Sequence, residues 1–424
     1  MERSPTHHIR YLLGGIIGLP LLIAIAIPLY LSGSPSLSAS SIPLTEVVTS
    51  TPNVLAITSG TPDIAEEPAS TTTVPTEVTD EATSEPEPEL TQRPALPQNE
   101  AVVGVVSALL ENQSGVYGII IEQPGMDPEF SQNEDIPFLA ASLYKLVLLA
   151  DVYEGIQNGV VSPDAELLLL PEYFPVEGEP ADSYFDTESA PETVTVTEAL
   201  FATGAYSSNV AALALLSLTD EISLEATARE IGMDHTYFYV DPRDLAEWPP
   251  TPGPDDDPEA LAESVTFIES TADSGPLMIT TPRDIATYFN ELMSDGIVDA
   301  DVSAQILEIL TQQVVDDRFP CLLPGGTEMA HKTGNLDHVV HDTGIIWSPE
   351  GPMILVAMAQ DPEDDGEATL VIQQLAVLAY TTLSDPYVII ETPPASICVE
   401  AEGTEVDPAT EVILEEQTTE EPVE

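Results

Sequence analysis

The sequence predicts a mixed α/β (α+β) domain, with an antiparallel sheet flanked by helices and a second, mostly helical lobe. Apolar residues at helical spacing occur near both ends of the globular region, at 100–111 and 368–383. Short β-type runs lie just inside these helices, at 116–121 and in a pair at 343–347 and 353–358 that a Ser-Pro-Glu-Gly turn joins. Helical stretches separate the two groups of strands, so distant segments should complete one sheet.

The composition supports a folded core and restricts the partners. Hydrophobic residues make up 43% of the 424 residues, which excludes a wholly disordered chain. Acidic residues number 74 against 9 basic ones, for a formal net charge of -65. Nucleic acid and anionic lipid surfaces need clustered Lys and Arg, so neither is an expected partner. The acidity is typical of a protein kept in solution in a salty medium.

The N-terminal segment predicts export from the cytoplasm. Residues 11–31 are apolar and uncharged, and as a helix they would span roughly 31 Å, close to the thickness of a bilayer core. Arg3 and Arg10 precede this run and the next basic residue is Arg93, which places residues 1–10 in the cytoplasm. We therefore expect an uncleaved transmembrane signal anchor. The alternative is a long cleaved signal peptide and a secreted protein.

The rest of the chain divides into a stalk, a domain and a tail. Residues 32–97 are rich in Pro, Thr, Ser and Glu and predict a disordered stalk, because they offer little apolar surface to bury. Residues 98–385 form the predicted domain, and residues 386–424 an acidic disordered tail.

Cys321 and Cys398 are the only cysteines. In an oxidising compartment they would form a disulfide that holds the tail to the domain, and the alternative is two unrelated thiols.

Lysine usage indicates a catalytic site. The chain contains only two lysines, Lys145 and Lys332. Lys145 follows Ser142 by three residues at the start of a predicted helix, so the hydroxyl and the amine share one helix face. A lysine can activate a serine nucleophile if burial or a second cation lowers its pKa. Lys332 is the candidate for that second cation.

Two further motifs accompany this Ser-x-x-Lys pair. Ser207, Ser208 and Asn209 follow an apolar segment, and Lys332-Thr333-Gly334 comes just before the predicted strand pair. Taken singly, each motif is equally compatible with helix capping or with surface residues. That both lysines fall in such motifs by accident has a chance on the order of one in a thousand.

The three motifs, in this order, resemble those of class A β-lactamases and penicillin-binding proteins. The resemblance extends over residues 98–385 and includes the segments 194–216, 280–287, 331–335 and 342–347. It implies a β-lactamase/transpeptidase-like fold and a serine hydrolase that forms an acyl-enzyme with β-lactams or related amides.

The resemblance also implies a role for each matching residue. Ser142 would be the nucleophile, Lys145 would help to remove its proton, and Ser207 would relay a proton to the departing nitrogen. Asn209, Lys332, Thr333, Gly334 and Asn335 would bind the substrate, and the backbone N–H groups of Ser142 and Asn335 would form the oxyanion hole.

Two departures from the family pattern concern the second half of the reaction. Ser208 stands where class A enzymes usually carry aspartate. The Arg-x-Glu-x-x-Leu-Asn pattern of the deacylating glutamate is absent between 232 and 280, which leaves Asp241, Asp244 and Glu247 as candidate bases. Each is also readily explained as a solvated loop carboxylate. The alternatives are therefore a D-alanyl-D-alanine carboxypeptidase-like protein or a non-hydrolysing protein that binds penicillin or peptidoglycan.

The expected partners follow from this interpretation. The substrate is a small-molecule β-lactam or a cell-wall peptide, and the N-terminal helix contacts the membrane. We expect a single-pass protein of the bacterial cell membrane, or a secreted one, with its catalytic domain outside the cytoplasm. We expect a monomer. We expect no metal or organic cofactor, since the histidines lie in no recognisable ligand spacing.

Overall fold

The computed structural model describes residues 100–382, except 177–178 and 220. The predicted anchor, stalk and tail lie outside the described residues, as does Cys398, so the disulfide with Cys321 stays a prediction. Within the described residues, no helix combines the length and the apolar character needed to cross a bilayer.

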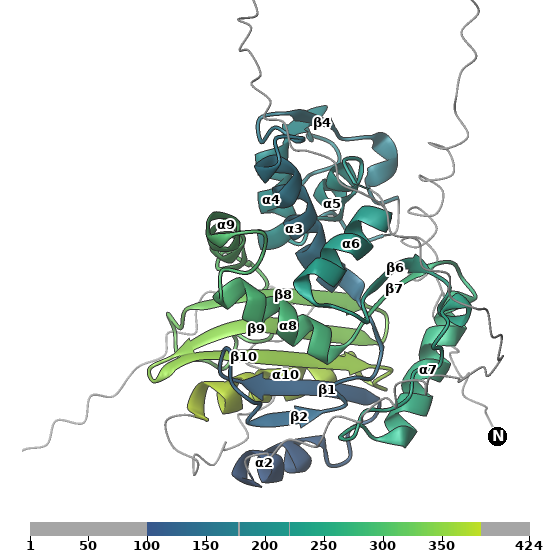
Figure 1. The fold of residues 1–424 in the computed structure, drawn as a ribbon, viewed down its shortest axis with the longest axis vertical. Helices are drawn as coiled ribbons and strands as arrows, with labels where there is room; N and C mark the ends of the chain where they lie inside the picture. The colour runs from purple at the N-terminus through teal and green to yellow at the C-terminus, as the bar shows by residue number, and fades with distance from the viewer. Residues whose placement is uncertain (1–99, 177–178, 220, 383–424) are drawn as a thin grey trace, which may run out of the picture. The chain divides into compact units, whose positions relative to one another are not determined.

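A five-stranded antiparallel sheet forms the centre of the fold. Its order is β2-β1-β10-β9-β8, with every neighbouring pair antiparallel. The strands are β1 (Val116–Glu122), β2 (Phe130–Gln132), β8 (Met329–Leu336), β9 (Val339–Ser348) and β10 (Gly351–Gln360). The blue strand β1 lies beside the yellow-green β10 (Figure 1), so segments far apart in the sequence do complete one sheet. The predicted fold class is confirmed.

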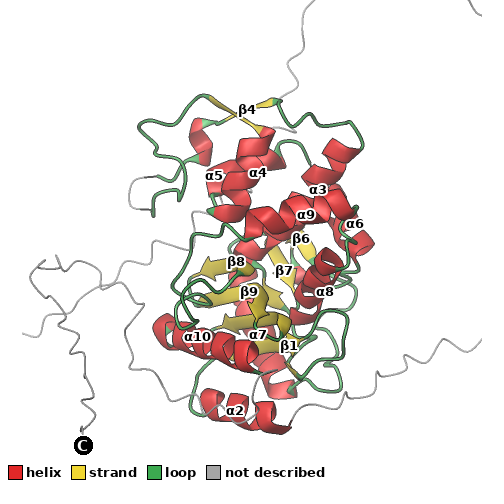
Figure 2. Cartoon of the chain, turned by 90° about the vertical axis from the view of Figure 1, so that its left-hand side faces the viewer, coloured by secondary structure: helices red, strands yellow, loops and turns green. Residues whose placement is uncertain are grey.

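Helices cover both faces of this sheet (Figure 2). Side chains of a strand alternate between its faces. Ile119 and Ile121 of β1 pack with α2 (Glu100–Leu110) and α10 (Asp365–Thr381), whereas Ile120 packs in a second core that includes α8 (Pro282–Met293). All seven residues of β1 are buried, which accounts for its nearly continuous apolar sequence.

The mostly helical lobe lies between the N-terminal and C-terminal parts of the sheet in the sequence. It contains α3 (Tyr144–Gln157), α4 (Val196–Ala205), α5 (Asn209–Leu216), α6 (Glu221–Ile231), α9 (Ala300–Leu310), the 3-10 turn η2 (Pro171–Tyr173) and the strand pair β4 (Glu166–Leu168) and β5 (Thr193–Thr195). Helix α3 is its central element, with Leu146 to Ala150 fully buried. The lobe and one face of the sheet share this hydrophobic core.

A second, smaller sheet connects the two parts. It has the order β3-β7-β6 and comprises β3 (Phe138–Leu139), β6 (Tyr237–Val240) and β7 (Leu277–Thr280). The 3-10 turn η3 (Pro242–Asp244) and α7 (Pro258–Ala272) lie between β6 and β7 in the sequence. Strand β3 leads directly into the 3-10 turn η1 (Ala141–Leu143), and this turn carries Ser142.

Candidate active site

Ser142 lies in a tightly held turn between β3 and α3. Ala141 adopts the left-handed conformation, with φ 45°, which is uncommon for a residue with a side chain. Just before the turn, the Leu139 N–H donates to Gln360 Oε1 at 2.8 Å, and the Leu139 carbonyl accepts a hydrogen bond from His341 Nε2 at 2.9 Å. Both partners are fully buried side chains of the central sheet, so the sheet holds the position of the serine.

The third motif faces the turn that carries Ser142. A Cβ atom added at Gly334 would lie 3.2 Å from Ala141 Cβ and 3.3 Å from Leu143 Cγ. Only glycine therefore allows edge strand β8 to approach the turn this closely without displacing it. Asn335 follows at the exposed end of β8.

Lys145 is completely buried one helical turn after Ser142. Its Nζ donates to the Ser207 carbonyl oxygen at 2.6 Å and to Asn209 Oδ1 at 2.7 Å, and lies 3.4 Å from Ser207 Oγ. Burial lowers the pKa of Lys145 to about 7, while the negative charge of Asp182 acts in the opposite direction. A neutral amine has two N–H groups and one lone pair. The two short hydrogen bonds use the N–H groups and leave the lone pair free to accept a proton.

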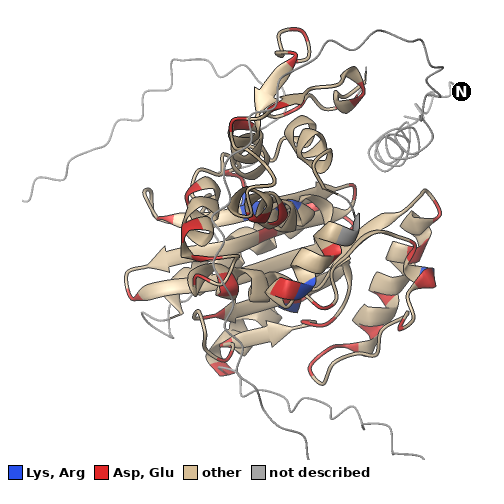
Figure 3. Ribbon diagram, turned by 45° about the horizontal axis from the view of Figure 1, so that its top comes forward, with Lys and Arg blue, Asp and Glu red and all other residues tan. Residues whose placement is uncertain are grey.

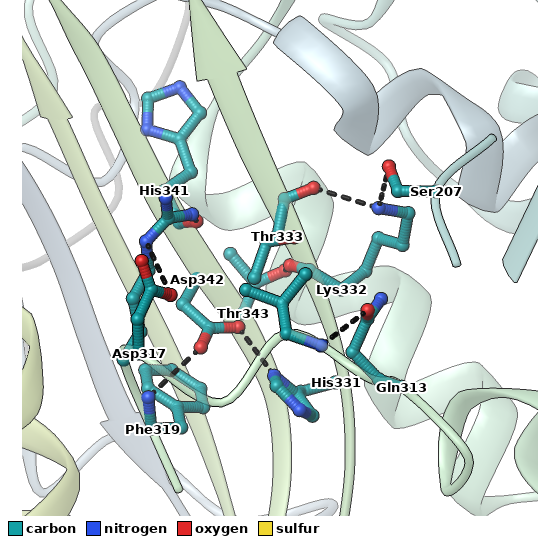
Figure 4. A network of polar contacts seen from close by, with 12 residues as sticks. Ser207, Gln313, Asp317, Phe319, His331, Lys332, Thr333, His341, Asp342 and Thr343 are labelled. Carbon is teal, nitrogen blue, oxygen red and sulfur yellow. Dashed lines mark hydrogen bonds and ion pairs between the residues drawn. The ribbon is translucent and has the colours of Figure 1, made fainter. Parts of the chain in front are cut away.

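Lys332 also contacts Ser207, from strand β8 (Figure 4). Its Nζ donates to Ser207 Oγ at 2.7 Å and to the Thr333 carbonyl oxygen at 2.9 Å. The side chain is 0% exposed. Burial lowers its pKa well below the usual value, and the positive charges of Lys145 and Arg318 add to this effect. Both lysines of the chain thus converge on Ser207.

A buried polar network lies behind the third motif (Figure 4). Asp342 accepts hydrogen bonds from the Phe319 N–H at 3.1 Å and pairs with His331 Nδ1 at 2.9 Å. The His331 ring stacks on Phe319, and Arg318 donates to the His341 carbonyl oxygen at 2.8 Å. These contacts fix β8 against β9, where Lys332 pairs in register with Thr343.

The structure thus brings together residues from all three sequence motifs. Ser142 and Lys145 come from η1 and α3, Ser207 and Asn209 from the α4–α5 junction, and Lys332, Thr333 and Gly334 from β8. Their functional groups are three hydroxyls, two amines of lowered pKa and an amide, which suit acid–base-assisted acyl transfer. Among the described residues, no group of three or more His, Cys, Asp or Glu side chains is arranged to hold a metal ion.

The three candidate deacylation bases are not joined to these motifs. Asp241 is paired with Arg243, which also bonds Asp273, the residue directly after α7. Asp244 and Glu247 are exposed. In the described part of the chain, none of the three candidate carboxylates forms a hydrogen bond or ion pair with a residue of the motifs.

One residue that contacts the site was not identified from the sequence. Asp182 lies in the loop between β4 and β5 and bonds the first residues of α5, including Asn209. No local signal marks it, because it is one of 74 acidic residues in the chain. The only indirect sign is Ser208, which leaves the second motif without a carboxylate of its own.

Comparison with known proteins identifies the family. The sequence model of the β-lactamase enzyme family matches residues 102–383, about two thirds of the chain. The chain belongs to this family. No curated protein matches the chain.

Solved structures of related proteins share the fold of this β-lactamase family member. A β-lactamase from Sphaerobacter thermophilus is 22% identical with a TM-score of 0.52, covering 67% of this chain and 97% of its own. A β-lactamase from Chitinophaga pinensis is 16% identical with a TM-score of 0.54, covering 66% and 99%. A variant of PBP-A, solved as an acyl-enzyme complex with penicillin G, is 20% identical with a TM-score of 0.52, covering 68% and 99%. The predicted resemblance is confirmed at the level of family and fold.

Proposed function

We propose that this protein is a serine hydrolase that opens β-lactams or related amides through an acyl-enzyme at Ser142. The observation that carries the proposal is the convergence of both lysines on Ser207, with Lys145 one helical turn from Ser142. A chain with 74 acidic and 9 basic residues buries its only two lysines in one place. Such burial is costly, and a catalytic use of the two amines accounts for it.

In the proposed reaction, Ser142 Oγ attacks the carbonyl carbon of the lactam while Lys145 Nζ takes the hydroxyl proton. The C–N bond of the lactam then breaks. The ring nitrogen receives a proton from Ser207 Oγ, which Lys145 replenishes across the 3.4 Å contact. The product is an ester between Ser142 and the opened substrate. Lys332 and Thr333 bind the substrate carboxylate, and the backbone N–H groups of Ser142 and Asn335 bind the carbonyl oxygen.

Hydrolysis of that ester is the second half of the proposed reaction. It needs a water molecule that a base activates, and within the described residues the candidate carboxylates Asp241, Asp244 and Glu247 form no hydrogen bond or ion pair with the motifs. This supports a second candidate function, a penicillin-binding protein or D-alanyl-D-alanine carboxypeptidase-like enzyme that holds its β-lactam adduct. The similarity to PBP-A, whose variant was solved with penicillin G bound covalently, is compatible with either function.

We also propose an extracytoplasmic location, with residues 11–31 as an anchor in the bacterial cell membrane. The support comes from the sequence: an uncharged apolar run, preceded by Arg3 and Arg10 and followed by no basic residue before Arg93. N-terminal sequencing of the mature protein tests this. Retention of the first residues is expected, and their loss would show a cleaved signal peptide instead.

Site mapping tests the proposed nucleophile. The full-length protein is incubated with a fluorescent penicillin, digested, and its labelled peptide sequenced by mass spectrometry. We expect the label on Ser142, with no label on the Ser142→Ala variant. Labelling of that variant at the wild-type rate, or of another residue, would overturn the proposal.

A further inference from the structure

The second motif depends on a carboxylate that comes from outside it. Helix α5 begins at Asn209, and its first-turn N–H groups have no partners within the helix. The hydroxyl oxygen of the N-cap residue Ser208 accepts a hydrogen bond from one of these groups, the Ala211 N–H, at 3.0 Å. The N–H groups of Asn209 and Val210 instead donate to Asp182 Oδ2, at 2.9 and 3.1 Å.

The same carboxylate also accepts a hydrogen bond from the hydroxyl of the N-cap residue. Ser208 Oγ donates to Asp182 across 2.8 Å to Oδ1 and 3.0 Å to Oδ2. Ser208 is fully buried, so this hydroxyl has no access to bulk solvent. The negative carboxylate is further stabilised by the positive end of the helix dipole.

On its other side, Asp182 organises its own loop. Its Oδ1 accepts the N–H groups of Tyr184 at 3.1 Å and Phe185 at 3.0 Å. The next residue, Ser183, donates to the Tyr206 carbonyl oxygen at 2.5 Å, and the Tyr184 ring packs edge-on against the Tyr206 ring with centroids 4.9 Å apart. The loop is therefore fastened to the residue just before Ser207.

This arrangement determines where two motif residues point. Ser207 has φ 56°, a left-handed conformation that costs free energy in a residue with a side chain and needs support from its surroundings. Asn209 Oδ1 accepts from Lys145, and Ser207 Oγ accepts from Lys332. If the first turn of α5 moved, both contacts would be lost together.

We infer that Asp182 is a positioning residue of the active site, which supplies from the β4–β5 loop the carboxylate that Ser208 does not provide. This inference rests on the proposed function of the site. Asp182 touches no reacting atom. Apart from the effect of its charge on the pKa of Lys145, it acts through the backbone of the second motif, so that Ser207 and Asn209 meet the two lysines.

An isosteric substitution tests the inference. In wild type, both carboxylate oxygens of Asp182 accept hydrogen bonds from N–H donors. In Asp182→Asn, an NH₂ group replaces one of these oxygens and cannot accept such a bond. We expect the acylation rate constant for penicillin to fall by about 10- to 100-fold, as expected for a small misplacement of catalytic groups. Asp186→Asn is the matched control. Asp186 is an exposed carboxylate in the same loop that accepts the Glu188 N–H, and we expect a change of less than about twofold.

A second substitution separates positioning from general loss of structure. Adding Ser208→Asp to Asp182→Asn returns a carboxylate to the N-cap, where aspartate is favoured. We expect this double variant to be acylated at least about threefold faster than Asp182→Asn alone. Wild-type acylation by Asp182→Asn would overturn the inference. Failure of Ser208→Asp to recover any activity would also overturn it, because the carboxylate would then not be the required element.

Amide hydrogen exchange keeps this test independent of catalysis. In the full-length protein, we expect Asp182→Asn to accelerate exchange at Asn209 and Val210, with α3 unchanged. If wild type is never acylated, the proposed function fails and the exchange result alone decides the inference. Unchanged exchange at these two amides would overturn it.

Discussion

At the scale of single residues, the site depends on two amines with lowered pKa values. Lys145 and Lys332 are both fully buried, and each donates to Ser207. An exposed lysine, with a pKa near 10.4, would be almost entirely protonated at neutral pH and could not act as a base. Burial brings the pKa of Lys145 to about 7, so about half of the molecules have the free base at that pH.

The pH dependence of acylation follows from this value. Below pH 7 the Lys145 amine is protonated, so the acylation rate constant should fall about tenfold for each pH unit. Above pH 7 the rate should level off, because the amine is already neutral. Stopped-flow acylation by a penicillin between about pH 5 and pH 10 measures the profile. A rate that keeps rising tenfold per unit up to pH 10 would show an ordinary lysine pKa and contradict the assignment.

Substitution of Lys145 checks that the profile belongs to this residue. Lys145→Ala should lower acylation by about a thousandfold, within the range for loss of a general base. Lys145→Arg keeps a positive charge but no usable base, and should be equally slow at every pH. Normal labelling of either variant would exclude Lys145 as the base.

At the scale of helices and strands, the close pairing of β8 and β9 places the third motif. A Cβ atom at Gly344 in β9 would lie 2.3 Å from the Ala330 carbonyl oxygen and 2.6 Å from His331 Cα. Both are backbone atoms of β8, next to Lys332, and they cannot rotate away as a side-chain end would. The absence of a side chain at Gly344 therefore determines how near the two strands lie.

Gly344→Ala should separate these strands. We expect a loss of about 2 kcal/mol or more in the free energy of unfolding, typical of overpacking, together with slower acylation because Lys332 moves. The matched control is Gly104→Ala in α2, where no atom lies within 4 Å of the added Cβ. In this exposed helix position the change should stabilise the protein by about 0.5–1 kcal/mol. Urea unfolding of both variants measures the difference, and equal stabilities would contradict this account of the strand pair.

Elements with strong periodicity could be predicted from the sequence, and those defined by distant contacts could not. The hairpin around its Ser-Pro-Glu-Gly turn was predicted, although β9 begins at Val339, earlier than the apolar run at 343–347 indicated. The small β3-β7-β6 sheet was not predicted, because β3 is only two residues long and pairs with a distant strand, where Leu139 lies opposite Ile279, 140 positions later. The contact of Asp182 with the second motif was not predicted for the same reason, because only the folded chain brings Asp182 to Asn209.

At the scale of the whole molecule, negative charge dominates. Asp and Glu recur over the described helices and loops, whereas Lys and Arg are few (Figure 3). The formal net charge of the chain is -65, and its two lysines lie inside the site rather than on the surface. A penicillin carries a carboxylate, so under the proposed function the chain repels its own substrate at long range.

Added salt should therefore accelerate capture of an anionic penicillin. Raising NaCl from about 0.01 M to about 1 M shortens the screening length from roughly 30 Å to 3 Å. We expect the second-order acylation rate constant to rise about threefold or more for an anionic penicillin, within the range of electrostatic effects on association. A zwitterionic penicillin is the matched control and should change by less than about twofold. An equal response of the two substrates, or a slower reaction of the anionic one, would show that the net charge does not govern approach to the site.

The most direct test of the central claim is the intact mass of the full-length protein over time after mixing with a penicillin. We predict that one penicillin adds per molecule in wild type and none in Ser142→Ala. Persistence of this adduct would identify a penicillin-binding protein or peptidase-type enzyme, and its rapid loss with accumulation of opened penicillin would identify a β-lactamase. If wild type forms no adduct and opens no penicillin, or Ser142→Ala reacts equally well, Ser142 is not the nucleophile and the account is wrong.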